Sequence, residues 1–67
     1  MYTVDVEREE DGRWIAEVTE LPGVLAYGQT REEAVRRAQA LSLHVLADRL
    51  EQGEPLPDVE SVFSIVA

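Results

Sequence analysis

The chain has 67 residues, which suffices for one domain, 1–67, and is too short for two. It contains no Cys, and this excludes disulfides and thiolate metal sites. Fourteen Asp and Glu residues against six Lys and Arg residues give a net charge of −8. A surface this acidic repels the phosphate backbone of nucleic acids, and we therefore expect no direct nucleic-acid binding. We expect it to attract a basic protein instead.

Hydropathy and chain length indicate where the protein is located and whether it self-associates. No apolar run approaches the roughly 20 residues that span a bilayer, and the N-terminus lacks a signal-peptide pattern. We therefore expect a cytoplasmic protein without membrane contact. A chain of this size buries only about 60% of the surface that its unfolded form exposes. Self-association, as a homo-dimer or homo-tetramer, is the expected supplement to so small a core.

The first part of the chain predicts a hairpin. Residues 2–8 alternate between apolar and polar side chains with period two, which is typical of a half-buried strand. Residues 9–13 form a polar loop, and the pair Asp11-Gly12 is its turn signal. Residues 14–18 then supply a second strand with the same alternation.

A third strand follows after a tight turn. Residues 21–23 read Leu-Pro-Gly, in which Pro fixes φ and Gly supplies the positive φ of a type II turn. Residues 24–27 are a short apolar run with β propensity. Two tight connections in succession predict an antiparallel meander of three strands.

One long helix is predicted next. Thr30 and Glu33 have the spacing of a capping box, in which the hydroxyl accepts from the N3 amide and the carboxylate accepts from the cap amide. The helix should run from about Arg31 to about Gln52, because Gly53 and Pro55 end it. One apolar face recurs at helical spacing, at Ala34, Val35, Ala38, Leu41, Val45 and Leu46.

Further apolar residues widen that face beyond what one sheet would cover. They are Leu43, Ala47 and Leu50. One interpretation is a thick helix edge beneath the C-terminal segment. The other, which the small core favours, is a homo-oligomer contact through the helix.

Residues 62–66 resume a β-like pattern after Pro57 and predict a last strand beside the first. The expected fold is therefore α+β, with the order β-β-β-α-β: an antiparallel meander sheet with one long helix packed on one face. The uncovered face of that sheet would carry four residues of the first two strands, namely Asp5, Glu7, Ile15 and Glu17.

Candidates for chemistry are weak. His44 falls on the polar side of the helix near Asp48, without a nucleophile beside it. Clustered carboxylates on the open sheet face could bind Mg²⁺, but such residues more often serve as a solvated surface. We expect no enzyme, no cofactor and no metal.

Contacts with partners or other copies have several candidates. Trp14, at the head of the second strand, is either core or an interface anchor, with the core favoured. The loop, the open sheet face and the helix edge are all eligible surfaces. Their candidate residues are Glu9, Glu10, Asp11, Trp14, Ile15, Leu43, Ala47 and Leu50.

The middle of the chain resembles the HicB family of toxin–antitoxin antitoxins. That family shows an aromatic-rich strand, a Leu-Pro-Gly turn, and then Gly-x-Thr-x-Glu-Glu-Ala at the start of a long helix. The matching residues here are Leu21, Pro22, Gly23, Gly28, Thr30, Glu32, Glu33 and Ala34. The resemblance extends over nearly the whole chain, and the family's degenerate RNase H-like fold has the same β-β-β-α-β order.

The resemblance implies a function. HicB-like domains bind a small basic mRNA-cleaving toxin, HicA, and mask its RNA site, and an acidic chain suits that role. Many HicB antitoxins carry a C-terminal DNA-binding domain, which this sequence is expected to lack because it ends at Ala67. The alternative is therefore a stand-alone oligomeric HicB-like domain with an unknown partner and no toxin.

Overall fold

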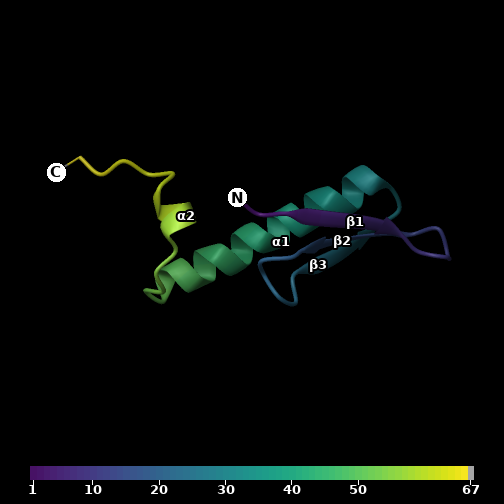
Figure 1. Ribbon diagram of the computed structural model, residues 1–67, viewed down its shortest axis with the longest axis horizontal. Coiled ribbons are helices and arrows are strands. Elements are labelled where there is room, and N and C mark those ends of the chain that lie inside the picture. Colours follow the sequence, from purple (N-terminus) through teal and green to yellow (C-terminus); the bar gives the residue numbers. More distant parts are fainter. Residues whose placement is uncertain (67) are drawn as a thin grey trace.

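The computed structural model describes residues 1–66 and contains a three-stranded antiparallel sheet crossed by one long helix (Figure 1). The strands are β1 (Val4–Arg8), β2 (Trp14–Val18) and β3 (Leu25–Gly28), in the spatial order β1-β2-β3. The long helix, α1 (Arg31–Glu51), lies along one face of the sheet, and a short helix, α2 (Pro57–Glu60), follows it. The predicted α+β class and the β-β-β-α order are confirmed.

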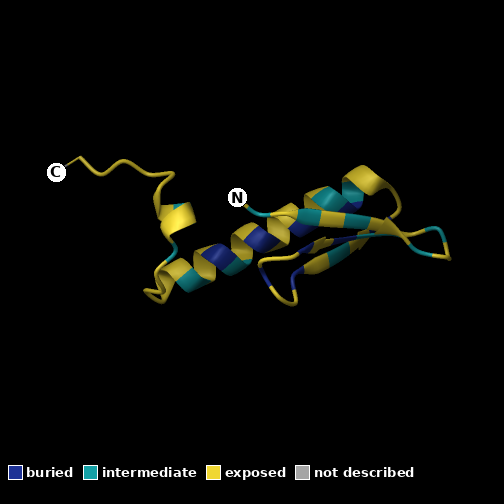
Figure 2. Ribbon diagram, in the orientation of Figure 1, coloured by how far each residue is buried: buried dark blue, intermediate teal, exposed yellow. Residues whose placement is uncertain are grey.

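The strand register separates an inner face, toward α1, from an outer face. Val4 lies opposite Val18, and Val6 lies opposite Ala16, which in turn lies opposite Ala26. These small and branched side chains alternate with polar ones, so the sheet presents its apolar set to the helix. The buried core lies between the sheet and α1 (Figure 2) and consists of Ala16, Val18, Leu21, Val24, Ala34, Ala38 and Leu46.

The turn between β2 and β3 has the predicted geometry. Gly23 has a φ of 87°, and the Val24 amide donates to the Leu21 carbonyl at 3.0 Å. Positive φ at the third position of the turn is what a type II turn requires, and glycine adopts it without steric cost. The turn places Leu21 and Val24 in the core on either side of it.

The start of α1 is capped by side chains, as the sequence predicts. The Glu33 amide donates to the Thr30 hydroxyl at 3.1 Å. The Glu33 carboxylate accepts from the Gln29 amide at 2.9 Å, one residue before the Thr30 amide that the capping box predicts. Both bonds satisfy amides near the helix start, and together they fix the path from β3 into α1.

The predicted last strand is wrong. Residues 62–66 form neither strand nor helix, and the residues before them form α2 instead. Pro57 occupies the first turn of α2, where its fixed φ suits a helix, and the Glu60 carboxylate accepts from the Leu56 amide at 2.8 Å. Residues 57–60 are therefore helical and do not form the connection that would lead the chain back to β1.

The length of α1 is a second reason why residues 62–66 do not pair with β1. Its 21 residues span about 31 Å, whereas a five-residue strand spans about 17 Å. The C-terminal part of α1 therefore projects beyond the sheet, and residues 61–66 continue away from it (Figure 1). The molecule is elongated as a result, with principal extents of 52 × 19 × 15 Å.

Candidate protein-binding surfaces

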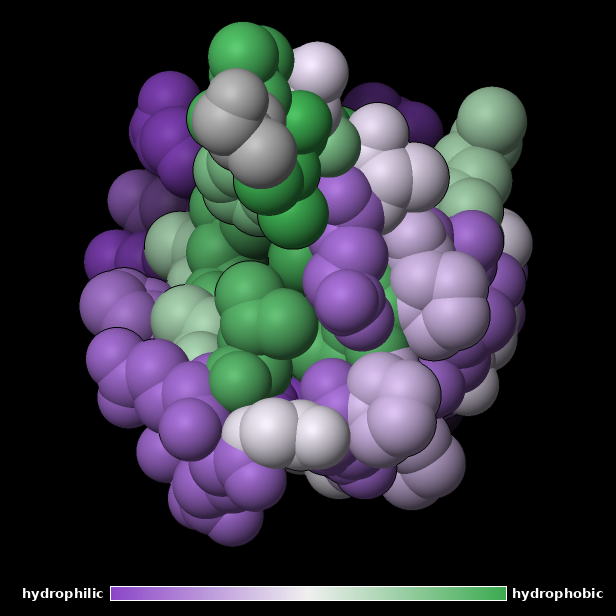
Figure 3. Space-filling model, turned by 90° about the vertical axis from the view of Figure 1, so that its left-hand side faces the viewer, coloured by the Kyte–Doolittle hydropathy of each residue, from purple (hydrophilic) through white to green (hydrophobic). Residues whose placement is uncertain are grey.

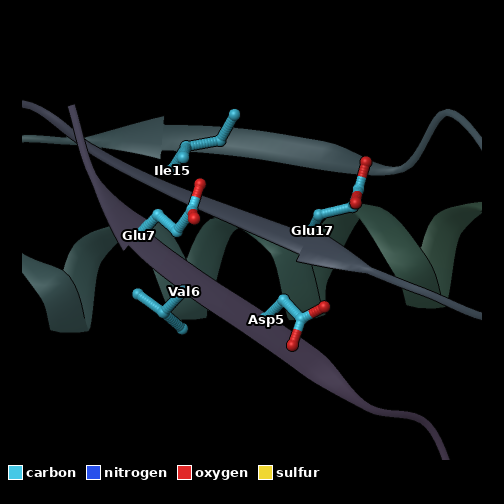
Figure 4. Close-up of a pocket in the computed structure, with 5 residues that line it drawn as sticks. All are labelled: Asp5, Val6, Glu7, Ile15 and Glu17. Carbon is cyan, nitrogen blue, oxygen red and sulfur yellow. The ribbon is translucent and has the colours of Figure 1, made fainter.

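Three carboxylates and one apolar side chain share the outer face of the sheet. Asp5 and Glu7 come from β1, and Ile15 and Glu17 come from β2, as the alternation predicts (Figure 4). The helix lies behind the sheet in this view, so these side chains are on the face that α1 leaves open. They line a shallow depression of about 650 Å³ together with Val6 at its margin.

Two cross-strand rows make up this outer face. In one row Glu17 lies between Asp5 and Leu25, and in the other Ile15 lies between Glu7 and Tyr27. Leu25 and Tyr27 keep 37% and 39% of their surface exposed, so β3 adds two apolar side chains to the face. The outer face is therefore acidic along β1 and apolar along β3.

The acidic side of the outer face carries an unfavourable charge arrangement. Asp5 and Glu17 are directly opposite each other across the β1–β2 ladder, and like charges in that position destabilise a sheet. Within residues 1–66, neither carboxylate forms an ion pair or a side-chain hydrogen bond. A cation from another molecule could therefore approach both of them.

An Arg side chain borders the apolar side. The Arg13 guanidinium lies over the Tyr27 ring, 4.6 Å from its centroid, which is a cation–π geometry. The same guanidinium donates from Nε to the Asp11 carboxylate at 2.7 Å, and the Arg13 amide donates to the other oxygen at 3.0 Å. These hydrogen bonds from Arg13 lower the pKa of Asp11.

Hydrogen bonds within the β1–β2 turn thus satisfy some of its polar groups. Of its three predicted contact residues, Asp11 is held by Arg13, and Glu9 closes the turn through its amide, which donates to the Arg13 carbonyl at 2.7 Å. Glu10 is exposed at the tip. The turn lies at the end of the sheet, beside the row that contains Ile15 and Tyr27.

Trp14 belongs to the inner side of the sheet. It is half-buried and packs against the core, with the Arg8 guanidinium 5.9 Å from its ring centroid. This packing fits the core interpretation of Trp14. His44 is exposed on α1.

The overhanging part of α1 forms a second surface, the apolar groove. Leu43 is 68% exposed, and the groove of about 430 Å³ continues along α1 to α2 and the N-terminus. Figure 3 shows this end of the molecule as an apolar strip bordered by hydrophilic residues. The groove is lined chiefly by Tyr2, Leu43, Ala47, Leu50, Val59 and Phe63.

Glu20 is a site residue that the sequence did not single out. Its carboxylate accepts from the Thr3 amide at 2.7 Å, the Thr3 hydroxyl at 2.8 Å and the Thr19 hydroxyl at 3.1 Å. These hydrogen bonds, chiefly those from Thr3, lower the pKa of Glu20 to about 2. Glu20 thereby fastens the entrance of β1 to the turn that follows β2. Strand pairing sets this contact, and the spacing of 17 residues carries no local signal for it.

Residues 1–66 contain no group of three or more His, Asp or Glu side chains placed to hold a metal ion. None of the helices in that range has the length and apolar character to cross a bilayer.

Comparison with known proteins returns no match to a family model, to a curated protein or to a solved structure.

Proposed function

We propose that the chain is a HicB-like antitoxin-type binding module, which docks the outer face of its sheet onto a small basic protein. The observation that carries this proposal is the grouping of Asp5, Glu7 and Glu17 on one open face, with no ion pair to any of them within residues 1–66. The partner class comes from the sequence resemblance around the Leu-Pro-Gly turn and the start of α1. That class is the HicA-like mRNA interferase.

Charge gives this face a mechanism of inhibition. An RNA-cleaving protein needs Lys and Arg side chains to hold the phosphate backbone. Carboxylates spaced along two strands could form ion pairs with these Lys and Arg side chains. Binding of RNA and binding of the acidic face would then be mutually exclusive. Electrostatic complementarity also speeds the encounter and weakens as salt is added. The chain itself performs no chemistry in this proposal.

The apolar side of the outer face supplies the remainder of the interface. Ile15, Leu25 and Tyr27 lie beside the carboxylates, and aromatic and aliphatic side chains beside charged ones are typical of protein interfaces. The Arg13 guanidinium lies over the Tyr27 ring, and this contact favours one orientation of the ring before binding. We expect affinity to depend on this apolar side and the association rate to depend on the acidic side.

The test asks whether an adjacent reading frame encodes a basic protein of similar size, and whether that protein binds the chain. We expect the two proteins to co-purify, and the complex to lack the RNA cleavage that the basic protein performs alone. The variant Asp5→Asn/Glu17→Gln should weaken the affinity on the order of tenfold, which corresponds to about 1.4 kcal/mol. A matched control, Glu32→Gln/Glu51→Gln, removes the same charge from exposed positions on α1 and should leave the affinity within about twofold.

Two results would contradict the proposal. One is a neighbouring basic protein that fails to bind the chain at low salt, where electrostatic attraction is strongest. The other is an equal loss of affinity in the outer-face variant and the α1 control, which would mean that net charge matters and the outer face does not.

A further inference from the structure

The molecule exposes more surface than a compact monomer of its mass. Its accessible surface is 5179 Å², whereas a folded monomer of 7.5 kDa is expected to expose about 4,250 Å². Its radius of gyration is 14.1 Å, against about 11 Å for a compact chain of this length. Roughly 900 Å² of surface is therefore exposed in excess of what a domain of this size retains when it folds alone.

Most of the large apolar side chains that are exposed lie at one end, in the apolar groove and in residues 61–66, which we call the tail. Val62 and Phe63 are 77% and 67% exposed, and Ile65 and Val66 are each 92% exposed. The tail contains no charged side chain, and it lies next to the groove in space because Val62 and Phe63 line one wall. Apolar side chains exposed this far, several in succession, mark a surface that another molecule covers.

The composition of the groove indicates what kind of molecule binds there. The groove is apolar apart from Asp58 and the N-terminal amine, which lie 3.9 Å apart. Because the Asp58 carboxylate is paired with that amine, a basic partner would find no unpaired carboxylate among the lining residues, whereas another apolar tail would complement the groove. A second copy of the chain supplies such a tail. The excess of roughly 900 Å² also matches the surface of about 800 Å² that each partner buries in a stable dimer.

We propose that two copies of the chain form a symmetric dimer in which the tail of each copy crosses the apolar groove of the other. The contact is reciprocal, as a two-fold axis requires, because each copy carries both the tail and the groove at the same end. Ile65 and Val66, the most exposed apolar residues of the tail, cover Leu43 and Ala47 of the other copy.

The dimer leaves the outer face of the sheet free. The groove lies where α1 projects beyond the sheet, while Asp5, Glu7 and Glu17 point away from α1 (Figures 1 and 4). Each dimer therefore presents two acidic faces, and the repelling carboxylates stay outside the contact. This inference does not depend on the proposed function, and the two can fail separately.

The first test is the mass of the chain in solution by sedimentation equilibrium. We expect twice the 7.5 kDa of one chain for the wild type and a single-chain mass for Leu43→Glu in the groove and Phe63→Glu in the tail. The control is Leu41→Glu, the same substitution at a half-exposed position on α1 outside the groove, which should remain dimeric. Phe63 follows α2, so its replacement should leave the sheet and α1 folded, as circular dichroism would verify.

A single-chain mass for the wild type would overturn the proposal, and so would a dimer that survives both Leu43→Glu and Phe63→Glu. Neither result bears on binding to a basic protein through the outer face, which is measured separately.

The second test locates the tail. Because the chain has no Cys, Ala47→Cys and Ser64→Cys can be introduced singly. Equal amounts of the two variants, oxidised together, should form a disulfide-linked heterodimer. The Ala47→Cys and Gln29→Cys pair should not, because Gln29 lies between β3 and the start of α1, and the groove lies along the C-terminal part of α1. If a chain that carries both Ala47→Cys and Ser64→Cys instead forms an intramolecular disulfide, the tail lies in the groove of its own chain. That result would overturn the proposal that the two copies exchange tails.

Discussion

Asp5 of β1 and Glu17 of β2 lie directly opposite each other on the outer face of the sheet, and no cation within residues 1–66 pairs with either. Two carboxylates in such a position repel each other and lower the stability of the ladder. A sheet that keeps this arrangement gains stability when a cation is supplied from outside. Binding and stability should therefore respond in opposite directions to the same substitution.

The first prediction concerns this opposition. Asp5→Asn or Glu17→Gln should raise the free energy of unfolding by about 0.2–1 kcal/mol, because either removes the cross-strand repulsion. The gain should shrink as salt is added, since both carboxylates are exposed and screened. Urea unfolding at low and high ionic strength measures it. A loss of stability in both variants would show that these carboxylates support the sheet.

The second prediction concerns acid unfolding. The hydrogen bonds from Thr3 and Thr19 hold the pKa of Glu20 at about 2, below its ordinary value of 4.5. A carboxylate whose pKa is lowered by folding stabilises the protein above the unfolded pKa, and this contribution is lost as the pH falls from about 4.5 to about 2. Glu20→Gln should therefore be less stable than the wild type at neutral pH and nearly equal to it at the acid end of that window.

Urea midpoints across the window provide the measurement. The control is Glu10→Gln in the β1–β2 turn, which should keep the stability difference between neutral and acid pH that the wild type shows. If the wild type and Glu20→Gln lose stability in parallel across the window, Glu20 does not fasten β1.

The third prediction concerns the close approach of β3 to α1. A Cβ on Gly28 would lie 2.5 Å from the Ala34 backbone nitrogen and 3.0 Å from its Cα. Gly28→Ala must therefore push the strand from the helix, and we expect a loss of about 1–3 kcal/mol. Because the obstructing atoms are backbone, adding Ala34→Gly should not restore stability. A rescued double variant would show that side-chain crowding is the cause.

The fourth prediction concerns the start of α1. Thr30→Ala removes the hydroxyl that accepts from the Glu33 amide and should cost about 1 kcal/mol. Thr30→Ser retains that acceptor, and Ser is at least as good an N-cap residue as Thr, so this variant should not lose stability. Thermal unfolding of the three proteins gives the comparison, and equal losses in both variants would assign the effect to the Thr methyl group.

The parts of the fold that local chemistry determines could be predicted from the sequence. Period-two alternation places Val4, Val6 and Ala16 on the face toward α1, and the structure has the same register. The positive φ of Gly23 and the Thr30 cap follow from residue types at fixed spacing. Each of these features depends on a few neighbouring residues, so no long-range information is needed.

The C-terminal segment was predicted wrongly because two local signals compete there. Residues 62–66 have β propensity, but Pro57 with Asp58 and Glu60 in its first turn is also a helix start. The helix forms, and the segment after it has no sheet edge within reach. β propensity alone does not make a strand, because a strand needs a neighbouring edge to pair with.

The candidate surfaces divide in the same way. The outer face, with Asp5, Glu7, Ile15 and Glu17, follows from alternation, whereas the addition of Leu25 and Tyr27 required the β2–β3 register. The groove at Leu43, Ala47 and Leu50 was visible as excess apolar residues on α1. Its continuation to Val59 and Phe63 depends on α2, which the residue pattern did not predict.

The most direct test of the central claim is the affinity of the chain for a basic protein encoded by an adjacent reading frame, measured by titration calorimetry at two salt concentrations. We predict tight binding that weakens as salt rises, and weaker binding with a smaller salt dependence for Asp5→Asn/Glu17→Gln. Binding that is absent, or that is the same for both proteins at both salt concentrations, would contradict the claim that the outer face of the sheet is the docking surface.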